Sequence, residues 1–221
     1  LGRDDQGTDG YQDVDYSLTT RELARMIKMA GIEFMKLEDE PYDNPLGEYT
    51  GAGVIFGATG GVMEAALRTA VEKLTGEELV DLDFVDVRGV KGVKEAEYEL
   101  QGKKVKVAVA SGLANARVIM DKVKAGEADY TFIEIMGCPG GCVNGGGQPH
   151  VDSQVRNFID VRAERAKGLY TLDKNAPIRK AHENPVIIKM YDDYLGVPGG
   201  EKAHHLLHTS YVNRGVNKQA D

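Results

Sequence analysis

Residues 130–147, YTFIEIMGCPGGCVNGGG, decide how the rest of the chain is interpreted. The first seven residues are a β-rich run, so we expect a strand that ends at Met136 and leads into a glycine-rich loop. The loop carries Cys138 and Cys142, which are the 2 cysteines of the 221-residue chain. Two thiols cannot build a disulfide framework, and they are half of the ligands that a four-coordinate metal site requires.

The loop has an unusual glycine content, with six glycines among the eleven residues 137–147. Each glycine loses conformational entropy on folding, so this is an unfavourable composition for an ordinary turn. It lets the backbone approach a bulky group closely, with N–H groups free to point at it. Both properties suit an iron–sulfur cluster, whose sulfur atoms accept N–H hydrogen bonds. The alternative is a pair of inert thiols, because free cysteine often packs as a small apolar residue.

Zinc is a second alternative for the cysteine pair. It would need two further ligands, for which His204, His205 and His208 are available. Apolar residues share the segment 203–207, and His204 and His208 are spaced i and i+4. This pattern is typical of one flank of an amphipathic helix, so we favour a helix over a zinc site.

The flanking sequence predicts strands that alternate with helices. Residues 80–87 alternate apolar and polar side chains, and two β-rich runs flank Gln101-Gly102. We expect strands over 80–87, 93–100, 103–110 and 130–136. We expect helices over 19–30 and 62–75, and a third helix that Ser111 caps and Gly126 ends. The order indicates an open α/β sheet with helices packed on it, in which ligands gather at the carboxyl ends of strands.

Three segments are expected. Residues 1–18 are an acidic linker or loose end, in a chain that begins with Leu1 rather than methionine. Residues 19–150 form the α/β lobe that carries the cysteine loop. Residues 151–221 are helical, with helices near 151–168 and 184–195, and Asn184 caps the second before a proline.

Charge and hydropathy exclude two classes of partner. The chain has 27 basic and 35 acidic residues, a net charge of −8 and a pI of about 5.2, so nucleic acid would be repelled. No apolar stretch approaches the roughly 20 residues that span a bilayer. No targeting segment is visible, which favours the cytoplasm over the periplasm.

The string FIEIMGCPGGCVNGGGQP closely resembles the third cluster-binding signature of the iron-only (FeFe) hydrogenases. Residues 19–31, 44–70 and 182–211 also resemble that family's catalytic domain and its C-terminal small-subunit-type segment. The resemblance implies the second lobe of the catalytic domain, a twisted sheet flanked by helices, followed by a helical C-terminal belt.

The resemblance also implies an H-cluster, a 4Fe-4S cubane joined to a two-iron unit with CO, cyanide and dithiolate ligands. Cys138 would bind the cubane, and Cys142 would bind it and bridge to the two-iron unit. Met136 would pack over the two-iron unit, which places Cys142 and Met136 in the catalytic centre. Phe56 and Val62 would line the same pocket; ordinary core packing is the alternative for these two side chains.

The family's other two cysteine ligands lie on signatures of the types TSCCPxW and MPCxxKxxE, which are absent here. We therefore expect the C-terminal part of a hydrogenase. Its partner is the N-terminal part, on a separate chain, on a cleaved fragment or on a segment of the same polypeptide beyond a break. The completed enzyme would interconvert protons plus electrons and dihydrogen, with a ferredoxin-like or other electron carrier. The alternative is a hydrogenase-like iron–sulfur protein with an electron-transfer, sensory or assembly role and no turnover.

Three further features have more ordinary interpretations. Residues 57–61, GATGG, precede a helix but lack the Gly-Lys-Ser/Thr ending of a phosphate loop, which disfavours nucleotide binding. Glu134 could carry protons, although a half-exposed strand position is the simpler expectation. His150 is expected in a loop and His182 at a helix boundary.

Overall fold

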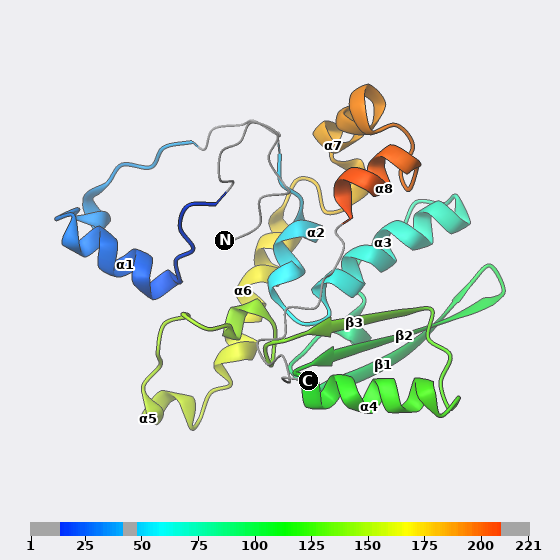
Figure 1. Ribbon diagram of the computed structural model, residues 1–221, viewed down its shortest axis with the longest axis horizontal. Helices are drawn as coiled ribbons and strands as arrows, with labels where there is room; N and C mark the ends of the chain where they lie inside the picture. The colour runs from blue at the N-terminus through cyan, green and yellow to red at the C-terminus, as the bar shows by residue number, and fades with distance from the viewer. Residues whose placement is uncertain (1–13, 42–47, 209–221) are drawn as a thin grey trace, which may run out of the picture.

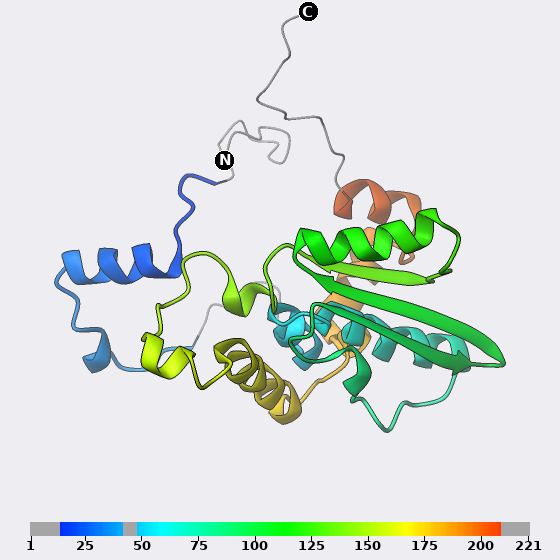
Figure 2. The ribbon, with the colours of Figure 1, turned by 90° about the horizontal axis from the view of Figure 1, so that it is seen from below.

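The computed structural model describes residues 14–41 and 48–208 of the chain. A three-stranded sheet with the order β1-β2-β3 lies between helices (Figures 1 and 2). Strand β1, Val93–Leu100, pairs antiparallel with β2, Lys103–Ser111, and β2 pairs parallel with β3, Phe132–Met136. The expected α/β class is therefore confirmed.

The hairpin between β1 and β2 turns at the dipeptide expected from the sequence. Gln101 has a φ of 50° and Gly102 a φ of 73°. Positive φ at both central positions matches the twist of the flanking strands, which is why such turns close two-residue hairpins.

The core is built on both faces of β2. Val107 and Val109 pack with Met63 and Leu67 of α3, Gly61–Thr75. Ala108 and Ala110 face the other way and pack with Ala116 and Ile119 of α4, Leu113–Lys124. Successive side chains of a strand point to opposite faces, so α3 and α4 cover opposite sides of the sheet, as Figure 2 shows.

The other helices surround this unit. They are α1, Thr20–Met29; α2, Gly51–Val54; α5, Ser153–Arg156; α6, Val161–Asn175; α7, Pro185–Met190, continued by a π-helical turn Tyr191–Leu195; and α8, Glu201–Leu207. Short 3-10 turns cover Phe34–Lys36, Ile55–Gly57, Val85–Val87, Cys142–Asn144 and Ala181–Glu183. Among the described residues no helix is long and apolar enough to cross a membrane.

Two expected helix caps are present. Thr19 and Glu22 form a reciprocal capping box at the start of α1. Asn184 caps α7, and its side chain accepts hydrogen bonds from the N–H groups of Val186 and Ile187.

The acidic segment before residue 14 and the end of the C-terminal tail lie outside the described residues.

Residues 80–87, which we expected to form a strand, do not form one. The segment is irregular and ends in the 3-10 turn Val85–Val87. Its Leu82 carbonyl accepts a hydrogen bond from Arg68 Nε at 3.0 Å, and the Asp83 carboxylate pairs with Arg88 and Arg179. Side chains therefore satisfy polar groups that a neighbouring strand would otherwise satisfy.

Two helix boundaries also differ from expectation. Ser111 is the last residue of β2 and is buried, so it does not cap α4. The N-cap of α4 is Gly112, and no side chain caps this helix. The helix expected over 151–168 is instead two helices, because Asp160 caps a new helix, α6, that runs on to Asn175. Gly126, with a φ of 71°, follows the end of α4 as expected.

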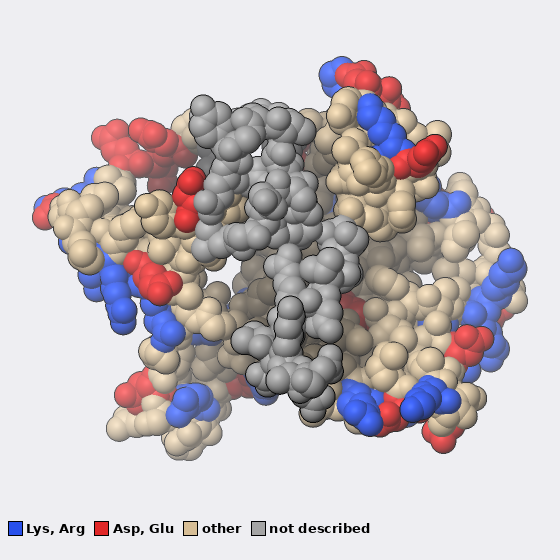
Figure 3. Space-filling model, in the orientation of Figure 1, with Lys and Arg blue, Asp and Glu red and all other residues tan. Residues whose placement is uncertain are grey.

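Acidic and basic side chains are interspersed around the rim of the face in Figure 3, among the residues that are described. No broad basic region stands out on the coloured part of that face.

Candidate metal centre

The cysteine loop begins at the carboxyl end of β3, where the Met136 carbonyl accepts a hydrogen bond from Gly112 N–H at 2.8 Å. Cys138 is half-buried, Cys142 is exposed, and both are free thiols. The Gly141 N–H donates to the Cys138 carbonyl at 2.9 Å. The turn Cys142–Asn144 then continues the loop. Both thiols are thus held on a hydrogen-bonded backbone at the edge of the sheet where ligand chemistry was expected.

Two glycines between the thiols are required by the geometry. Gly140 has a φ of 86° and Gly141 a φ of 100°, a region that side chains disfavour. A Cβ atom on Gly141 would lie 2.6 Å from the Gly57 carbonyl oxygen and 2.7 Å from the Thr59 nitrogen. The loop therefore lies directly on the backbone of residues 57–59.

That contact joins the cysteine loop to the other stretch singled out in the sequence. The Thr59 N–H donates to the Gly140 carbonyl at 3.1 Å. Phe56 and Val62 flank this contact on either side along the chain. Phe56 is 46% exposed, so ordinary core packing does not describe it, and Val62 is half-buried.

Arg165 of α6 anchors the second half of the loop and was missed in the sequence. Its Nη1 donates to the Val143 carbonyl at 2.9 Å and its Nη2 to the Pro149 carbonyl at 2.8 Å. The Asn144 side chain adds a bond to the Pro139 carbonyl at 3.0 Å. Carbonyl acceptors leave no mark in a sequence, so only the fold reveals this arginine's role.

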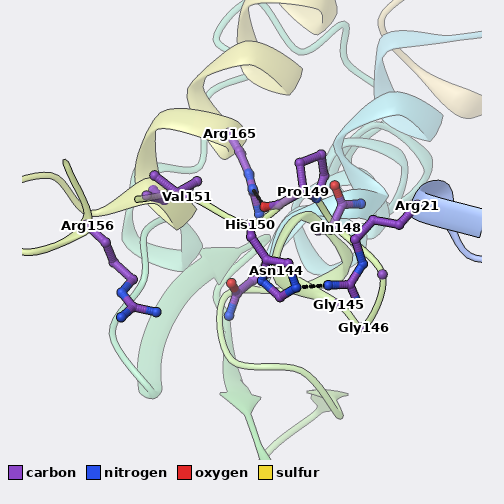
Figure 4. Close-up of a pocket in the computed structure, with 12 residues that line it drawn as sticks. Arg21, Asn144, Gly145, Gly146, Gln148, Pro149, His150, Val151, Arg156 and Arg165 are labelled. Carbon is purple, nitrogen blue, oxygen red and sulfur yellow. Dashed lines mark hydrogen bonds between the residues drawn. The ribbon is translucent and has the colours of Figure 1, made fainter. Parts of the chain in front are cut away.

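A hollow of about 270 Å³ lies beside the residues that follow the thiols. Figure 4 draws the residues that line it. Arg21, Arg156 and Arg165 line it together with residues 144–151, and neither cysteine does. Arg21 hydrogen-bonds the ring of His150, which lies in a loop as expected. The hollow therefore borders the loop without containing its thiols.

Glu134 is not half-exposed, as we expected, but 6% exposed. Its carboxylate accepts hydrogen bonds from the N–H groups of Gly60 at 2.6 Å and Met63 at 2.7 Å. These are among the groups at the N-terminus of α3 that would otherwise attract an external anion. The protein's own carboxylate occupies that position.

Lys94 is a second buried charge beside the same loop. Its ammonium donates to the carbonyls of Thr59 at 3.0 Å and Gly89 at 2.9 Å. Burial lowers the pKa of Lys94 to about 8, although the nearby Glu134 carboxylate acts in the opposite direction. The sequence offered no signal for Lys94, because an isolated lysine in a strand is usually solvated.

The zinc alternative gains no support from the described residues. The rings of His204 and His208 stack on each other, with their centroids 4.3 Å apart, on or beside α8. Among the described residues, neither histidine forms a group of potential metal ligands with a cysteine. The cluster of potential metal ligands that does occur is formed by Glu72, His182 and Glu183. There the Lys180 ammonium already bridges the two carboxylates, at 2.5 Å from Glu72 and 2.9 Å from Glu183.

Comparison with known families decides the relationship. A model described as the iron only hydrogenase large subunit, C-terminal domain, matches residues 2–146. The chain belongs to the iron-only hydrogenase family. A second model, the iron hydrogenase small subunit, matches residues 159–214 of this hydrogenase-family chain. The resemblance seen in the sequence is therefore confirmed.

Individual hydrogenases align with nearly the whole chain. Iron hydrogenase 1 of Clostridium pasteurianum is 51% identical over 203 residues, which cover 92% of this chain and 35% of the relative. The NADP-reducing hydrogenase subunit HndD of Solidesulfovibrio fructosivorans is 48% identical, over 96% of this chain and 35% of the relative. This hydrogenase-family chain thus spans about a third of the length of these curated relatives.

Solved structures agree with the fold. FeFe-hydrogenase HydA1 from Chlamydomonas reinhardtii matches with a TM-score of 0.71 and 42% identity, over 92% of this chain and 56% of that one. A HydA structure concerned with stepwise H-cluster assembly matches with a TM-score of 0.74, over 97% of this chain and 60% of that one. The chain therefore has the fold of the corresponding part of an FeFe-hydrogenase catalytic domain.

Two more distant relatives carry different names. Protein NAR1 of Arabidopsis thaliana is 33% identical, over 99% of this chain and 47% of the relative. Cytosolic iron-sulfur assembly component 3 of Rattus norvegicus is 31% identical over 93% of this chain. Membership of the family therefore does not by itself establish catalysis.

The donor groups fit an iron–sulfur cluster in part. Thiolates are the usual ligands of such clusters, and a cubane takes four. This hydrogenase-family chain offers two, on a loop whose glycines let the backbone approach closely. The residues present therefore fit half of a ligand set.

Proposed function

We propose that this chain is the part of an FeFe hydrogenase that supplies two of the four cysteine ligands of an H-cluster. The observation that carries the proposal is the pair of free thiols, Cys138 and Cys142, on one loop. Two glycines with positive φ in this loop let its backbone contact residues 57–59. The 51% identity to an iron hydrogenase supports the same assignment. The assembled enzyme interconverts protons plus electrons and dihydrogen.

Each residue has a defined task in this proposal. Cys138 holds the cubane, and Cys142 holds it and bridges to the two-iron unit. Met136, Phe56 and Val62 form an apolar wall that keeps water from the cluster's diatomic ligands. The exposed Phe56 ring suits a wall that faces a bound group better than a core position. When bound, the cluster supplies electron transfer and the iron site for hydrogen chemistry.

The proposal needs partners. The other two thiolates and the acid–base relay come from the N-terminal part of the hydrogenase. Electrons come from a ferredoxin-like or other carrier. The chain alone is therefore expected to be inactive. Hydrogen evolution by the isolated, reconstituted 221-residue chain would contradict this division.

Infrared spectroscopy and iron analysis of the assembled protein test the proposal. We expect CO and cyanide bands in the wild type, and their loss in Cys138→Ala and Cys142→Ala. Gly146→Ala is a matched control, because a Cβ atom there meets nothing within 4 Å. Retention of bands and iron in both cysteine variants would refute ligation by this loop.

The second candidate is an iron–sulfur protein with an electron-transfer, sensory or assembly role and no turnover. The relatives NAR1 and cytosolic iron-sulfur assembly component 3 favour it, at 33% and 31% identity. It predicts iron and sulfide of a cubane without CO or cyanide bands. The higher identity to the iron hydrogenases favours the catalyst.

A further inference from the structure

One row of the sheet carries two buried charges of opposite sign. Lys94 of β1 pairs with Val109 of β2, and Val109 pairs in turn with Glu134 of β3. Val109 packs toward α3, so the row points at the face that α3 covers. Lys94 and Glu134 are each 6% exposed on this otherwise apolar face.

Both charges bind the same peptide group. The Lys94 ammonium donates to the carbonyl oxygen of Thr59 at 3.0 Å. The Glu134 carboxylate accepts from the N–H of Gly60, the other end of that peptide, at 2.6 Å. A cation at the oxygen and an anion at the hydrogen match the dipole of a peptide, so together they fix its orientation.

The clamped peptide sits between α3 and the cysteine loop. Glu134 also accepts from Met63 N–H at 2.7 Å, which ties it to the first turn of α3. On the other side, the N–H of Thr59 donates to the carbonyl of Gly140, a residue that lies between the two cysteines in the sequence. Gly60 has a φ of 93°, and a Cβ atom there would lie 1.8 Å from the Val87 carbonyl oxygen. The peptide therefore cannot shift without moving the segments on either side of it, the 3-10 turn that carries Phe56 and the start of α3 that carries Val62.

We propose that Lys94 and Glu134 are positioning residues that clamp the Thr59–Gly60 peptide and so set the apolar wall of the cluster pocket against the cysteine loop. This inference rests on the proposed function of that pocket. The clamp acts through the backbone and leaves Phe56, Val62 and the thiols as the groups that face the cluster. Burying two charges on an apolar face is costly unless each is well bonded, and here the loop's backbone supplies those bonds.

Amide hydrogen exchange tests the clamp without reference to the cluster. We compare Glu134→Gln and Lys94→Met with the exposed controls Glu99→Gln and Lys103→Met from the same hairpin. Gln cannot accept from both N–H groups, so we expect the amides of Gly60 and Met63 to exchange at least about tenfold faster. The control variants should exchange like the wild type.

Infrared spectra of the assembled, cluster-loaded protein provide the second readout. We expect the CO and cyanide bands of both clamp variants to shift or broaden while their iron content is unchanged, because the wall moves and the thiols do not. Unchanged exchange and unchanged bands in both variants would overturn the clamp. Wild-type protein without CO or cyanide bands would instead refute the proposed function, and the exchange result would still stand.

The wild type alone keeps the inference testable if either variant fails to fold. The clamp requires the amides of Gly60 and Met63 to be protected, although amides that start a helix usually lack an intrahelical partner. Exchange of both amides at the rate of an exposed loop would overturn the clamp.

Discussion

Arg68 and Asp173 lie 105 positions apart in the chain and form a buried, two-point ion pair, with distances of 2.7 and 2.8 Å. The other donors of the Arg68 guanidinium bind the Leu82 carbonyl, the Arg179 carbonyl and the Glu64 carboxylate. All five donors therefore have a partner. The pair joins α3 to α6, so it links the two segments matched by the two family models.

Arg68→Met should destabilise the protein by on the order of 3 kcal/mol, because it removes the fully buried cation that Asp173 and Glu64 share. Each carboxylate then keeps one partly exposed arginine, Arg179 for Asp173 and Arg88 for Glu64. Urea unfolding of the two proteins measures the difference. Arg117→Met is the matched control: Arg117 pairs with Asp121 on the exposed face of α4, where a pair contributes about 0.5 kcal/mol or less. Equal losses in both variants would show that burial of the Arg68 pair is not the cause.

Gly141→Ala should displace the cysteine loop, because its φ of 100° disfavours a side chain and a Cβ atom would meet the Gly57 carbonyl at 2.6 Å. We expect iron uptake to fall at least tenfold and the free energy of unfolding to drop by about 1–3 kcal/mol. Iron analysis after reconstitution and denaturant unfolding measure the two effects. Gly146→Ala should change neither, and normal iron uptake by Gly141→Ala would contradict the close loop contact.

Glu72 should make the protein sensitive to acid. Burial raises the pKa of Glu72, but hydrogen bonds from Lys180, the Leu79 N–H and His182 outweigh it and lower the pKa from 4.5 to about 2. A carboxyl with a lowered folded-state pKa stabilises the protein above its unfolded value, and that stability is lost as the pH falls from about 4.5 to about 2.

The loss can be measured by thermal unfolding between pH 2 and pH 6. We expect Glu72→Gln to remove a contribution on the order of 1 kcal/mol at pH 6, because solvent screens these ion pairs, and to flatten the pH dependence. Glu78→Gln removes an exposed carboxylate from the neighbouring segment and should leave the profile unchanged. A wild-type profile that is flat over this range would contradict the assignment.

Asn184→Ala should cost about 1–2 kcal/mol. Its side chain caps α7 by accepting from Val186 N–H at 3.0 Å, and its amide donates to the Glu48 carbonyl at 2.6 Å. Asn175→Ala, at the exposed end of α6, should stay within about 0.5 kcal/mol of the wild type. Denaturant unfolding distinguishes them; a similar small effect for both would mean that the cap does not contribute.

Local signals were sufficient for much of the fold. The hairpin at Gln101-Gly102, the strand leading to Met136 and the cap at Asn184 depend on residues close to each other in the chain. The strand expected over residues 80–87 was wrong, because alternating apolar and polar side chains are compatible with a strand but do not supply a strand partner. The Arg68, Arg88 and Arg179 side chains bind its polar groups instead.

The candidate site divides in the same way. The thiols and glycines of residues 137–147 are contiguous, and so the sequence alone was enough to single out this loop and, by resemblance, to name the family. Membership was then confirmed by the match over residues 2–146. The parts that hold the loop in place, Arg165, Lys94 and Glu134, act through backbone groups distant in sequence.

By itself the sequence determined the α/β class, the two thiols and the glycines that let the backbone approach a bulky group, because these follow from composition and short-range periodicity. Only the tertiary structure decided that Glu134 and Lys94 are buried on one row, that Gly141 rests on residues 57–59 and that Arg68 meets Asp173. Burial and hydrogen-bond partners are set by strand register and helix packing, which bring together residues that no local pattern connects.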